Sequence, residues 1–352
     1  MDQPVFEAIN LLSELISTPS LSGEEKKTAD LIEDFLQRKG INTSRIGHNI
    51  ISHYTGANPD DPYILLCSHH DTVKPNAGYS RDPFSADQID TKMYGLGSND
   101  AGGALVSLIA AYCEIVRKKI KINLVLAAVA EEETSGPGGV ISVLPELPGI
   151  DLAIVGEPTG MDIAVAEKGL VVIDAITQGK PGHAAHSNTI NPILTAAQDI
   201  GRINQYKFDR ISPYLGETKA SVTVIRAGEL HNQVPAECHF VIDVRVNELY
   251  TLQEVVDLLQ MEVQSKLTPR SLRLNPSGIN ADHKMLKIAG DLGIHTFGSA
   301  TLSDQALLPY PSIKMGPGDS LRSHTADEFI YVSEISEGIN KYIQLIEAYS
   351  AK

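Results

Sequence analysis

Residues 65–75, LLCSHHDTVKP, decide how the rest of the sequence is interpreted. An apolar run, YILLC at 63–67, has the character of a buried strand and is followed at once by His69, His70 and Asp71. On an extended chain His69 and Asp71 face the same way, whereas His70 faces the opposite way. Ligands of an open parallel sheet bind outside the carboxyl ends of its strands. We therefore predict that this strand end forms the floor of a binding site.

Three further apolar runs have the length of buried strands, and helical segments lie between them. The strands are predicted at 122–130, 152–156 and 312–316, and the helices at 5–16, at 22–40 and from Ala104 onward. Such alternation is typical of an α/β fold, in which a mostly parallel sheet carries helices on both faces. Ser22, with Glu25 three residues later, predicts a capping box at the start of the second helix.

The middle of the chain has a different pattern. Strands are predicted at 170–178, 220–227, 237–246 and 271–275, and helices after Pro192 and at 251–265. The order β-α-β-β-α-β is that of a ferredoxin-like α+β unit. We therefore predict an α+β domain at 169–280, inserted into an α/β domain formed by residues 1–168 and 281–352.

Composition limits the class of protein. The chain has 352 residues, which suits two domains, and its net charge is −15. That charge argues against nucleic acid and anionic membranes as partners. Cys67, Cys113 and Cys238 have no paired spacing, so we expect no disulfide framework and a cytoplasmic location. The N-terminus lacks the basic start of a signal peptide, and no apolar run approaches the roughly 20 residues of a membrane span.

Side chains of metal-ligand type follow every predicted strand of the first domain. They are His69, the triplet Glu131, Glu132 and Glu133, then Glu157 and His324, with Asp100 at the end of a glycine-rich turn. Imidazole and carboxylate together suit zinc, which takes about four ligands. Two histidines and three carboxylates exceed one zinc, but they suit two ions roughly 3.5–4 Å apart that share a carboxylate. Asp100 is the best bridging candidate, because its flanking glycines permit close approach.

The acid triplet also offers a general base. Adjacent glutamates on an extended segment point in opposite directions, so one can bind metal while another takes a proton from a metal-bound water. Asp71 is placed to accept the free N–H of His69. Each residue alone has an ordinary explanation, such as a helix N-cap for Asp100. The joint placement of these residues at strand ends favours the metal site.

Over its whole length the chain resembles the dinuclear-zinc aminoacylase and carboxypeptidase family. The matching segments are SHHDTVKP, YGLGSNDAGG, AEEETSGPGG, VGEPT, GKPGHAAHS, HNQVP, DVR and HTADEFI. The family includes acetylornithine deacetylase, succinyl-diaminopimelate desuccinylase and carboxypeptidase G. The resemblance implies a zinc-peptidase-like catalytic domain with two Zn²⁺, for which Co²⁺ can substitute. It also implies that the inserted domain is a lid that forms a homodimer.

The resemblance assigns a role to each candidate residue of the metal site. One zinc would be held by His69, Asp100 and Glu157, and the other by Asp100, Glu133 and His324. Glu132 would be the general base, and Asp71 would orient His69.

Four further residues would act on the substrate. By the same resemblance, His183 would reach the site of the other subunit and stabilise the oxyanion. Asn232 and Arg245 would contact the substrate, the arginine through the substrate carboxylate. Gly316 belongs to a substrate-lining loop, MGPG at 315–318. Three positions depart from the commoner family pattern without removing a ligand, namely Glu131, Gly102 and Ser187.

Hydrolysis of a small N-acyl amino acid is the function that the resemblance implies. N-acetylornithine, in arginine biosynthesis, is the first expectation, and acetyl or succinyl forms of ornithine or citrulline stay open. The alternatives within the family are succinyl-diaminopimelate desuccinylase and a dipeptidase. An inactive, metal-bound binder of acyl amino acids and an oligomeric scaffold are alternatives of other classes. The pair Glu132 and Glu133 favours an enzyme, because a binder needs no free base beside its metals.

Overall fold

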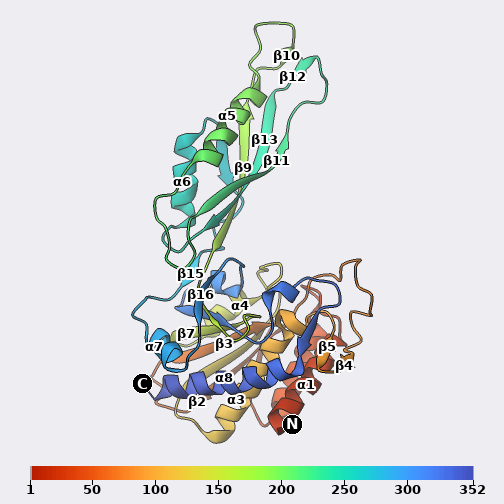
Figure 1. The fold of residues 1–352 in the computed structure, drawn as a ribbon, viewed down its shortest axis with the longest axis vertical. Coiled ribbons are helices and arrows are strands. Elements are labelled where there is room, and N and C mark those ends of the chain that lie inside the picture. Colours follow the sequence, from red (N-terminus) through yellow and green to blue (C-terminus); the bar gives the residue numbers. More distant parts are fainter. Residues whose placement is uncertain (1, 352) are drawn as a thin grey trace. The chain divides into compact units, whose positions relative to one another are not determined.

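The computed structural model describes residues 2–351, whose contacts divide them into two compact units (Figure 1). The first unit comprises Met1–Val165, Gly278–Phe297 and Ser303–Lys352, and the second comprises Ala166–Ser277 and Gly298–Leu302. The second unit is thus an insertion whose main segment begins and ends three residues before the predicted 169–280. The short segment Gly298–Leu302 also belongs to it.

A nine-stranded sheet runs through the first unit in the order β1-β2-β6-β3-β7-β17-β8-β15, with β16 paired to β8. Its strands are β1 Ser44–Ile46, β2 Asn49–Thr55, β3 Tyr63–His69, β6 Asn123–Val129, β7 Ile150–Gly156, β8 Ile163–Glu167, β15 Ser277–Gly278, β16 Thr296–Ser299 and β17 Ser312–Met315. The four central strands β6, β3, β7 and β17 pair in parallel, as the buried apolar runs predict. Their carboxyl ends therefore share one edge.

Both faces of these central strands are covered, which explains why their sequences are apolar throughout. Leu66 and Leu126 face a core shared with the helices α1 and α3, whereas Leu65 and Val125 face a second core that includes α4. The helices of this unit are α1 Gln3–Ile16, α2 Lys26–Arg38, α3 Gly103–Lys118, α4 Val140–Val143, α7 Lys284–Asp291 and α8 Val332–Ser350. A small antiparallel sheet, β18 Phe329–Tyr331, β5 Lys92–Tyr94 and β4 Gln88–Ile89, completes it.

The predicted capping box at Ser22 and Glu25 is wrong. Helix α2 does begin directly after Glu25, but no side chain caps its first turn. The Ser22 hydroxyl instead donates to the carboxylate of Asp71 at 2.6 Å. The Glu25 carboxylate accepts the backbone N–H groups of Gly23 and Glu131. Both side chains are therefore used by parts of the chain far from the helix that they precede.

The second unit has a four-stranded antiparallel sheet in the order β11-β13-β9-β14. Its elements, in chain order, are β9 Gly169–Gln178, α5 Pro192–Gln205, β11 Lys219–Arg226, β13 Glu237–Val246, α6 Leu252–Glu262 and β14 Lys266–Pro269. A separate two-stranded antiparallel sheet pairs β10 Gly182–His183 with β12 Gln233–Val234. The predicted ferredoxin-like order is thus present. The strand predicted at 271–275 is wrong, because the last strand is β14, in which Leu267 is buried, whereas Leu272 is exposed.

Two expectations about the chain as a whole were tested. Among residues 2–351, no helix is both long and apolar enough to cross a membrane. Cys67, Cys113 and Cys238 are free thiols, as their spacing predicts.

Candidate metal centre and active site

The carboxyl ends of the central strands deliver the candidate ligands to one edge of the sheet. His69 ends β3 and lies opposite Val129, the last residue of β6, from which the chain continues into the acid triplet. Glu157 follows the end of β7, where Gly156 pairs with Met315 of β17. Because these strands are parallel and in register, their terminal side chains meet.

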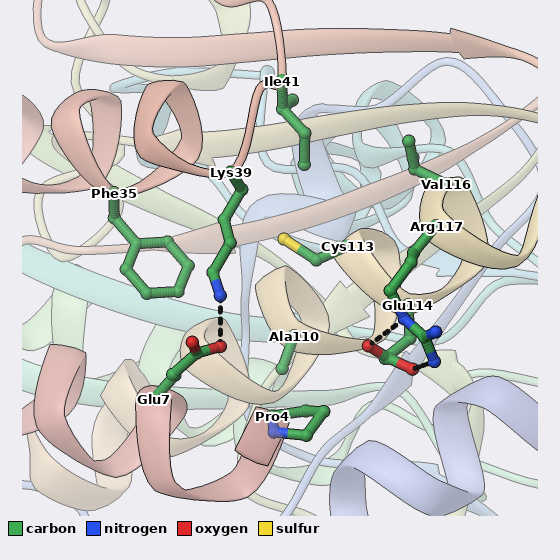
Figure 2. Close-up of a pocket in the computed structure, with 10 residues that line it drawn as sticks. All are labelled: Pro4, Glu7, Phe35, Lys39, Ile41, Ala110, Cys113, Glu114, Val116 and Arg117. Carbon is green, nitrogen blue, oxygen red and sulfur yellow. Dashed lines mark hydrogen bonds and ion pairs between the residues drawn. The ribbon is translucent and has the colours of Figure 1, made fainter.

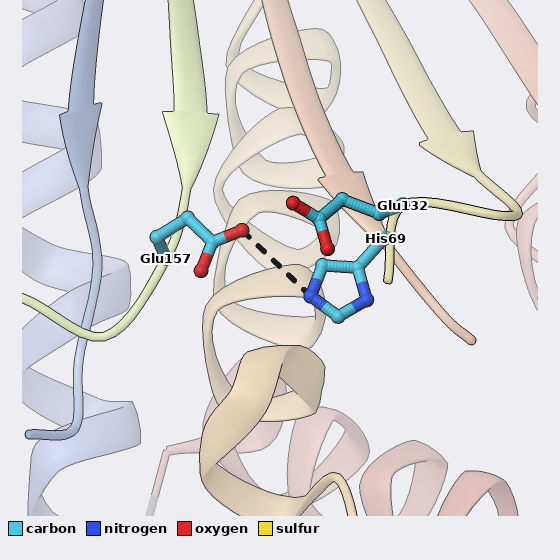
Figure 3. A group of neighbouring side chains, drawn as sticks. All are labelled: His69, Glu132 and Glu157. Carbon is cyan, nitrogen blue, oxygen red and sulfur yellow. Dashed lines mark ion pairs between the residues drawn. The ribbon is translucent and has the colours of Figure 1, made fainter. Parts of the chain in front are cut away.

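The imidazole of His69 lies at the centre of this group (Figure 3). Its Nε2 atom is 3.5 Å from Asp100 Oδ1 and 3.7 Å from Glu157 Oε1. Two sets of possible ligand atoms, each within 4.8 Å of one another, include it: one with Glu132 and Glu157, the other with Asp100 and Glu133. Figure 3 shows the carboxylates of Glu132 and Glu157 both directed toward this ring.

The second histidine lies on the other side of Asp100. His324 Nε2 is 3.0 Å from Glu133 Oε2 and 3.6 Å from Asp100 Oδ2. Asp100 therefore turns one carboxylate oxygen toward His69 and the other toward His324. The structure thus brings all five candidate ligands together, with Asp100 between the two histidines.

The chemistry of this cluster fits cations. His69 Nε2 is buried and has no hydrogen-bond partner within residues 2–351, yet it faces carboxylates, which can only accept. Burial opposes a charge on His69, but the nearby carboxylates of Asp100 and Asp71 raise the pKa of its ring well above the usual value. The hydrogen bond to Glu133 raises the pKa of His324 to about 9. The carboxylates around both rings therefore favour a positive charge at this site, and a bound metal ion would supply that charge.

Glu132 lies in the same cluster and has the environment of a proton acceptor. Burial raises its pKa well above the ordinary value, His69 opposes the rise, and Glu157 and Asp304 add to it. A raised pKa suits a carboxylate that must take a proton and later return it near neutral pH.

The alternation predicted for Glu132 and Glu133 is wrong, because the segment is not extended. Residues 132–135 form a turn, and Glu131 before it has a left-handed backbone with φ of 55°. The turn carries both carboxylates to His69, one beside Glu157 and the other beside Asp100. The two glutamates therefore differ because they lie beside different partners, and not because they point to opposite faces of a strand.

Asp71 binds both His69 and the acid triplet. Its backbone carbonyl lies 2.9 Å from His69 Nδ1, closer than its carboxylate at 3.4 Å. The carboxylate accepts the backbone N–H groups of Glu132 at 3.0 Å and Glu133 at 3.2 Å. Burial opposes its charge, but His69 and these donors lower the pKa of Asp71 to about 2. Asp71 therefore fixes the ring of His69 and also holds the glutamate turn.

Glu328 also supports the site, although the sequence patterns did not indicate it. Its buried carboxylate accepts the backbone N–H groups of Asn99 at 2.8 Å and Asp100 at 2.9 Å. It therefore holds the backbone of the bridging aspartate. Its place in the HTADEFI segment, four residues after His324, was the available signal.

Gly316 lies beside a candidate ligand. A side chain there would place its Cβ 2.5 Å from the backbone oxygen of Glu157 and 2.8 Å from Ala104. The close approach requires glycine at this position of the loop.

The remaining predicted residues lie in the second unit. His183 pairs with Gln233 in the two-stranded sheet, and the Asn232 carbonyl accepts the Ala184 N–H at 2.9 Å. Arg245 forms a bidentate ion pair with Asp243, with N–O distances of 2.9 and 3.2 Å. The side chain of Arg245 is 41% exposed. The guanidinium is thus oriented by Asp243 and remains accessible.

A pocket of about 200 Å³ lies in the first unit beside α1, α2 and α3 (Figure 2). It lacks the metal-ligand chemistry of the cluster around His69. Its two cations are paired, Lys39 with Glu7 and Arg117 with Glu114. Burial raises the pKa of the Cys113 thiol to about 12, so the thiol stays protonated. The cluster around His69 is therefore the stronger candidate site.

Residues 65–348 match the sequence pattern of peptidase family M20/M25/M40. The chain belongs to this family. Acetylornithine deacetylase of Photorhabdus laumondii is 27% identical, with 97% of each chain covered. Succinyl-diaminopimelate desuccinylase of Cereibacter sphaeroides is 23% identical, covering 98% of this chain and 100% of the relative. A Bacillus subtilis protein described as a dinuclear metal binding peptidase of family M20 has the same fold, with a TM-score of 0.76, 17% identity and 99% of each chain covered.

Family membership agrees with the geometry of the site. M20 proteins are metal-dependent hydrolases with a typically dinuclear centre, and the chain is an amidohydrolase of this family. The cluster around His69 and Asp100 supplies the ligand types that such a centre needs.

Zinc is expected to stabilise the first unit, because it neutralises acids that otherwise lie close together. A free ion concentration 100 times the dissociation constant adds about 2.7 kcal/mol to the free energy of unfolding. For a unit of this size, that corresponds to a rise in melting temperature of roughly 5–10 °C. Differential scanning calorimetry with and without Zn²⁺ measures it. A melting temperature unchanged by zinc, or not lowered again by a chelator, would contradict binding at this cluster.

Proposed function

We propose that the protein hydrolyses the amide bond of an N-acyl amino acid, with N-acetylornithine as the first candidate substrate. The observation that supports this most is the position of Glu132, a partly buried carboxylate beside His69 and Glu157 that the two-ion ligand set does not need. A site that only bound acyl amino acids would have no use for such a base. The similarity to an acetylornithine deacetylase and a desuccinylase supports the choice of substrate class.

In the proposed site, His69, Asp100 and Glu157 hold one divalent cation, and Asp100, Glu133 and His324 hold the other. Zinc, or cobalt in its place, supplies Lewis acidity and lowers the pKa of water when bound. His69 presents Nε2 to the cluster because its Nδ1 donates to the carbonyl of Asp71.

Glu132 moves the proton in the proposed reaction. Its carboxylate accepts a proton from the attacking water and afterwards delivers it to the nitrogen of the leaving amine. The acyl group leaves as a carboxylate, and the amino acid leaves with a free amine. His183 is proposed to reach the site of the other subunit and stabilise the developing oxyanion. Asn232 and Arg245 are proposed to contact the substrate, with the accessible side of the Arg245 guanidinium binding the substrate carboxylate. Gly316 belongs to the loop that is proposed to line the substrate.

Two further properties belong to this proposal. The second unit forms a homodimer through the edge of its sheet, where Val224 and Ile225 of β11 are exposed apolar side chains. The protein works in the cytoplasm, where its three free cysteines stay reduced.

An assay of amine release tests the function. The zinc-loaded protein is offered the acetyl and succinyl forms of ornithine, citrulline, lysine and diaminopimelate, and the metal content is measured in parallel. We expect two ions per chain and the highest kcat/KM for N-acetylornithine. A preference for succinyl-diaminopimelate or for dipeptides would favour the alternative substrates. Two bound ions without turnover of any of these compounds would favour a binder instead.

A further inference from the structure

Four consecutive backbone N–H groups, those of Ala130 to Glu133, all donate to side chains from elsewhere in the chain. Asn49 Oδ1 accepts the Ala130 N–H at 2.8 Å, and Glu25 Oε1 accepts the Glu131 N–H at 3.2 Å. The Asp71 carboxylate accepts the next two, those of Glu132 and Glu133. The segment that carries Glu132 is therefore held amide by amide, by three buried side chains.

Several hydrogen bonds hold the Glu25 carboxylate in this position. Its side chain is fully buried, and its carboxylate also accepts the Gly23 N–H at 2.6 Å. The other oxygen lies 2.9 Å from His48 Nδ1. A buried carboxylate is costly unless hydrogen bonds satisfy it, so these donors fix its position closely.

Asn49 ties the two ends of the loop together. It is fully buried at the start of β2, and its amide group donates to the Gly138 carbonyl at 2.7 Å and to the Ile46 carbonyl at 2.8 Å. Within the loop, the carboxylate of Glu131 accepts the Gly138 N–H at 2.9 Å. The loop from Ala130 to Gly138 is thus closed from outside by Asn49 and from inside by Glu131.

We propose that Glu25 and Asn49 are positioning residues for the general base, a role that nothing in the family comparison assigns to them. They hold the backbone at 130 and 131, and with Asp71 they determine where the Glu132 carboxylate lies. The inference rests on the proposed function, since Glu132 needs a defined place only if it transfers a proton. A purely structural role would instead lower stability and leave turnover per folded molecule unchanged.

The test compares three variants of the full-length, zinc-loaded protein. Glu25→Ala removes the acceptor, and Glu25→Gln keeps an oxygen for the Glu131 N–H. Glu33→Ala is the control, because Glu33 lies on the helix that follows Glu25 but is bonded to Thr43 and Arg45. We expect Glu25→Ala to lower kcat by about 10–100-fold, with KM and metal content unchanged. This is the usual size of the effect when a residue that orients an active-site group is lost. Glu25→Gln should recover most of kcat, and Glu33→Ala should retain it.

Hydrogen exchange of the backbone amides provides a readout that needs no substrate. We expect faster exchange at residues 130–133 in Glu25→Ala and unchanged exchange there in Glu33→Ala. If the unmodified protein hydrolyses no acyl amino acid, the proposed function fails, and the exchange data still decide whether Glu25 holds the loop. If Glu25→Ala folds, binds two ions and keeps its kcat, the positioning role is overturned.

Asn49→Asp covers the case in which Glu25→Ala does not fold. Aspartate keeps an acceptor for the Ala130 N–H but turns an anionic oxygen toward the Gly138 carbonyl, which loosens the loop. We expect kcat to fall with KM unchanged and exchange at residues 130–133 to rise. An unchanged kcat in this variant would overturn the proposal.

Discussion

Replacing Glu132 with glutamine is expected to lower kcat by about 10²–10⁴-fold while both metal ions stay bound. Glutamine has nearly the same size and can still accept a hydrogen bond, but it cannot take a proton from water. Glu132 is partly buried beside His69 and Glu157, the position from which the proposed base acts. Steady-state kinetics with N-acetylornithine, together with metal analysis, measure the effect.

Two comparisons make this result specific. Glu146→Gln, at an exposed position of the same unit, should retain full activity. Glu133→Gln should lose metal, because Glu133 faces His324 and Asp100. If Glu132→Gln keeps most of its activity, the assignment of the general base is wrong. If it loses an ion, Glu132 is a ligand.

Replacing Asp100 with alanine is expected to abolish binding of both ions and to lower kcat/KM by roughly 10³-fold or more, since metal ions supply several kcal/mol of transition-state stabilisation. One oxygen of Asp100 faces His69 and the other faces His324, so both positions lose a ligand at once. Metal content after dialysis, measured by mass spectrometry, is the direct readout, and activity follows from it.

His324→Ala is the informative comparison for Asp100. The nearest acids to His324 are Glu133 and Asp100, so its loss should remove one ion of the two. Asp30→Ala, an acid on the surface of α2, should leave the metal content unchanged. Retention of two tightly bound ions by Asp100→Ala would show that Asp100 does not bridge them.

Local sequence patterns are sufficient to predict the parallel core and the ligand types at its edge. Apolar runs such as 63–67 and 122–130 are buried on both faces, and burial on both faces selects a continuous apolar pattern. Because parallel strands end at one edge, the polar residues after each run had to meet there. His69, Glu157 and the acid triplet could therefore be assigned to one site before any distance was known.

The hydrogen bonds that support the site come from contacts between distant segments, which local patterns do not predict. Ser22 and Glu25 have the local spacing of a capping box, yet their partners are Asp71, 49 residues away, and Glu131, 106 residues away. The turn that brings Glu132 and Glu133 to the same ring likewise depends on donors and acceptors from other segments. Periodicity and spacing report the conformation of a segment a few residues long. Hydrogen bonds between distant segments form only when the sheet brings those segments together, and they then override the local preference.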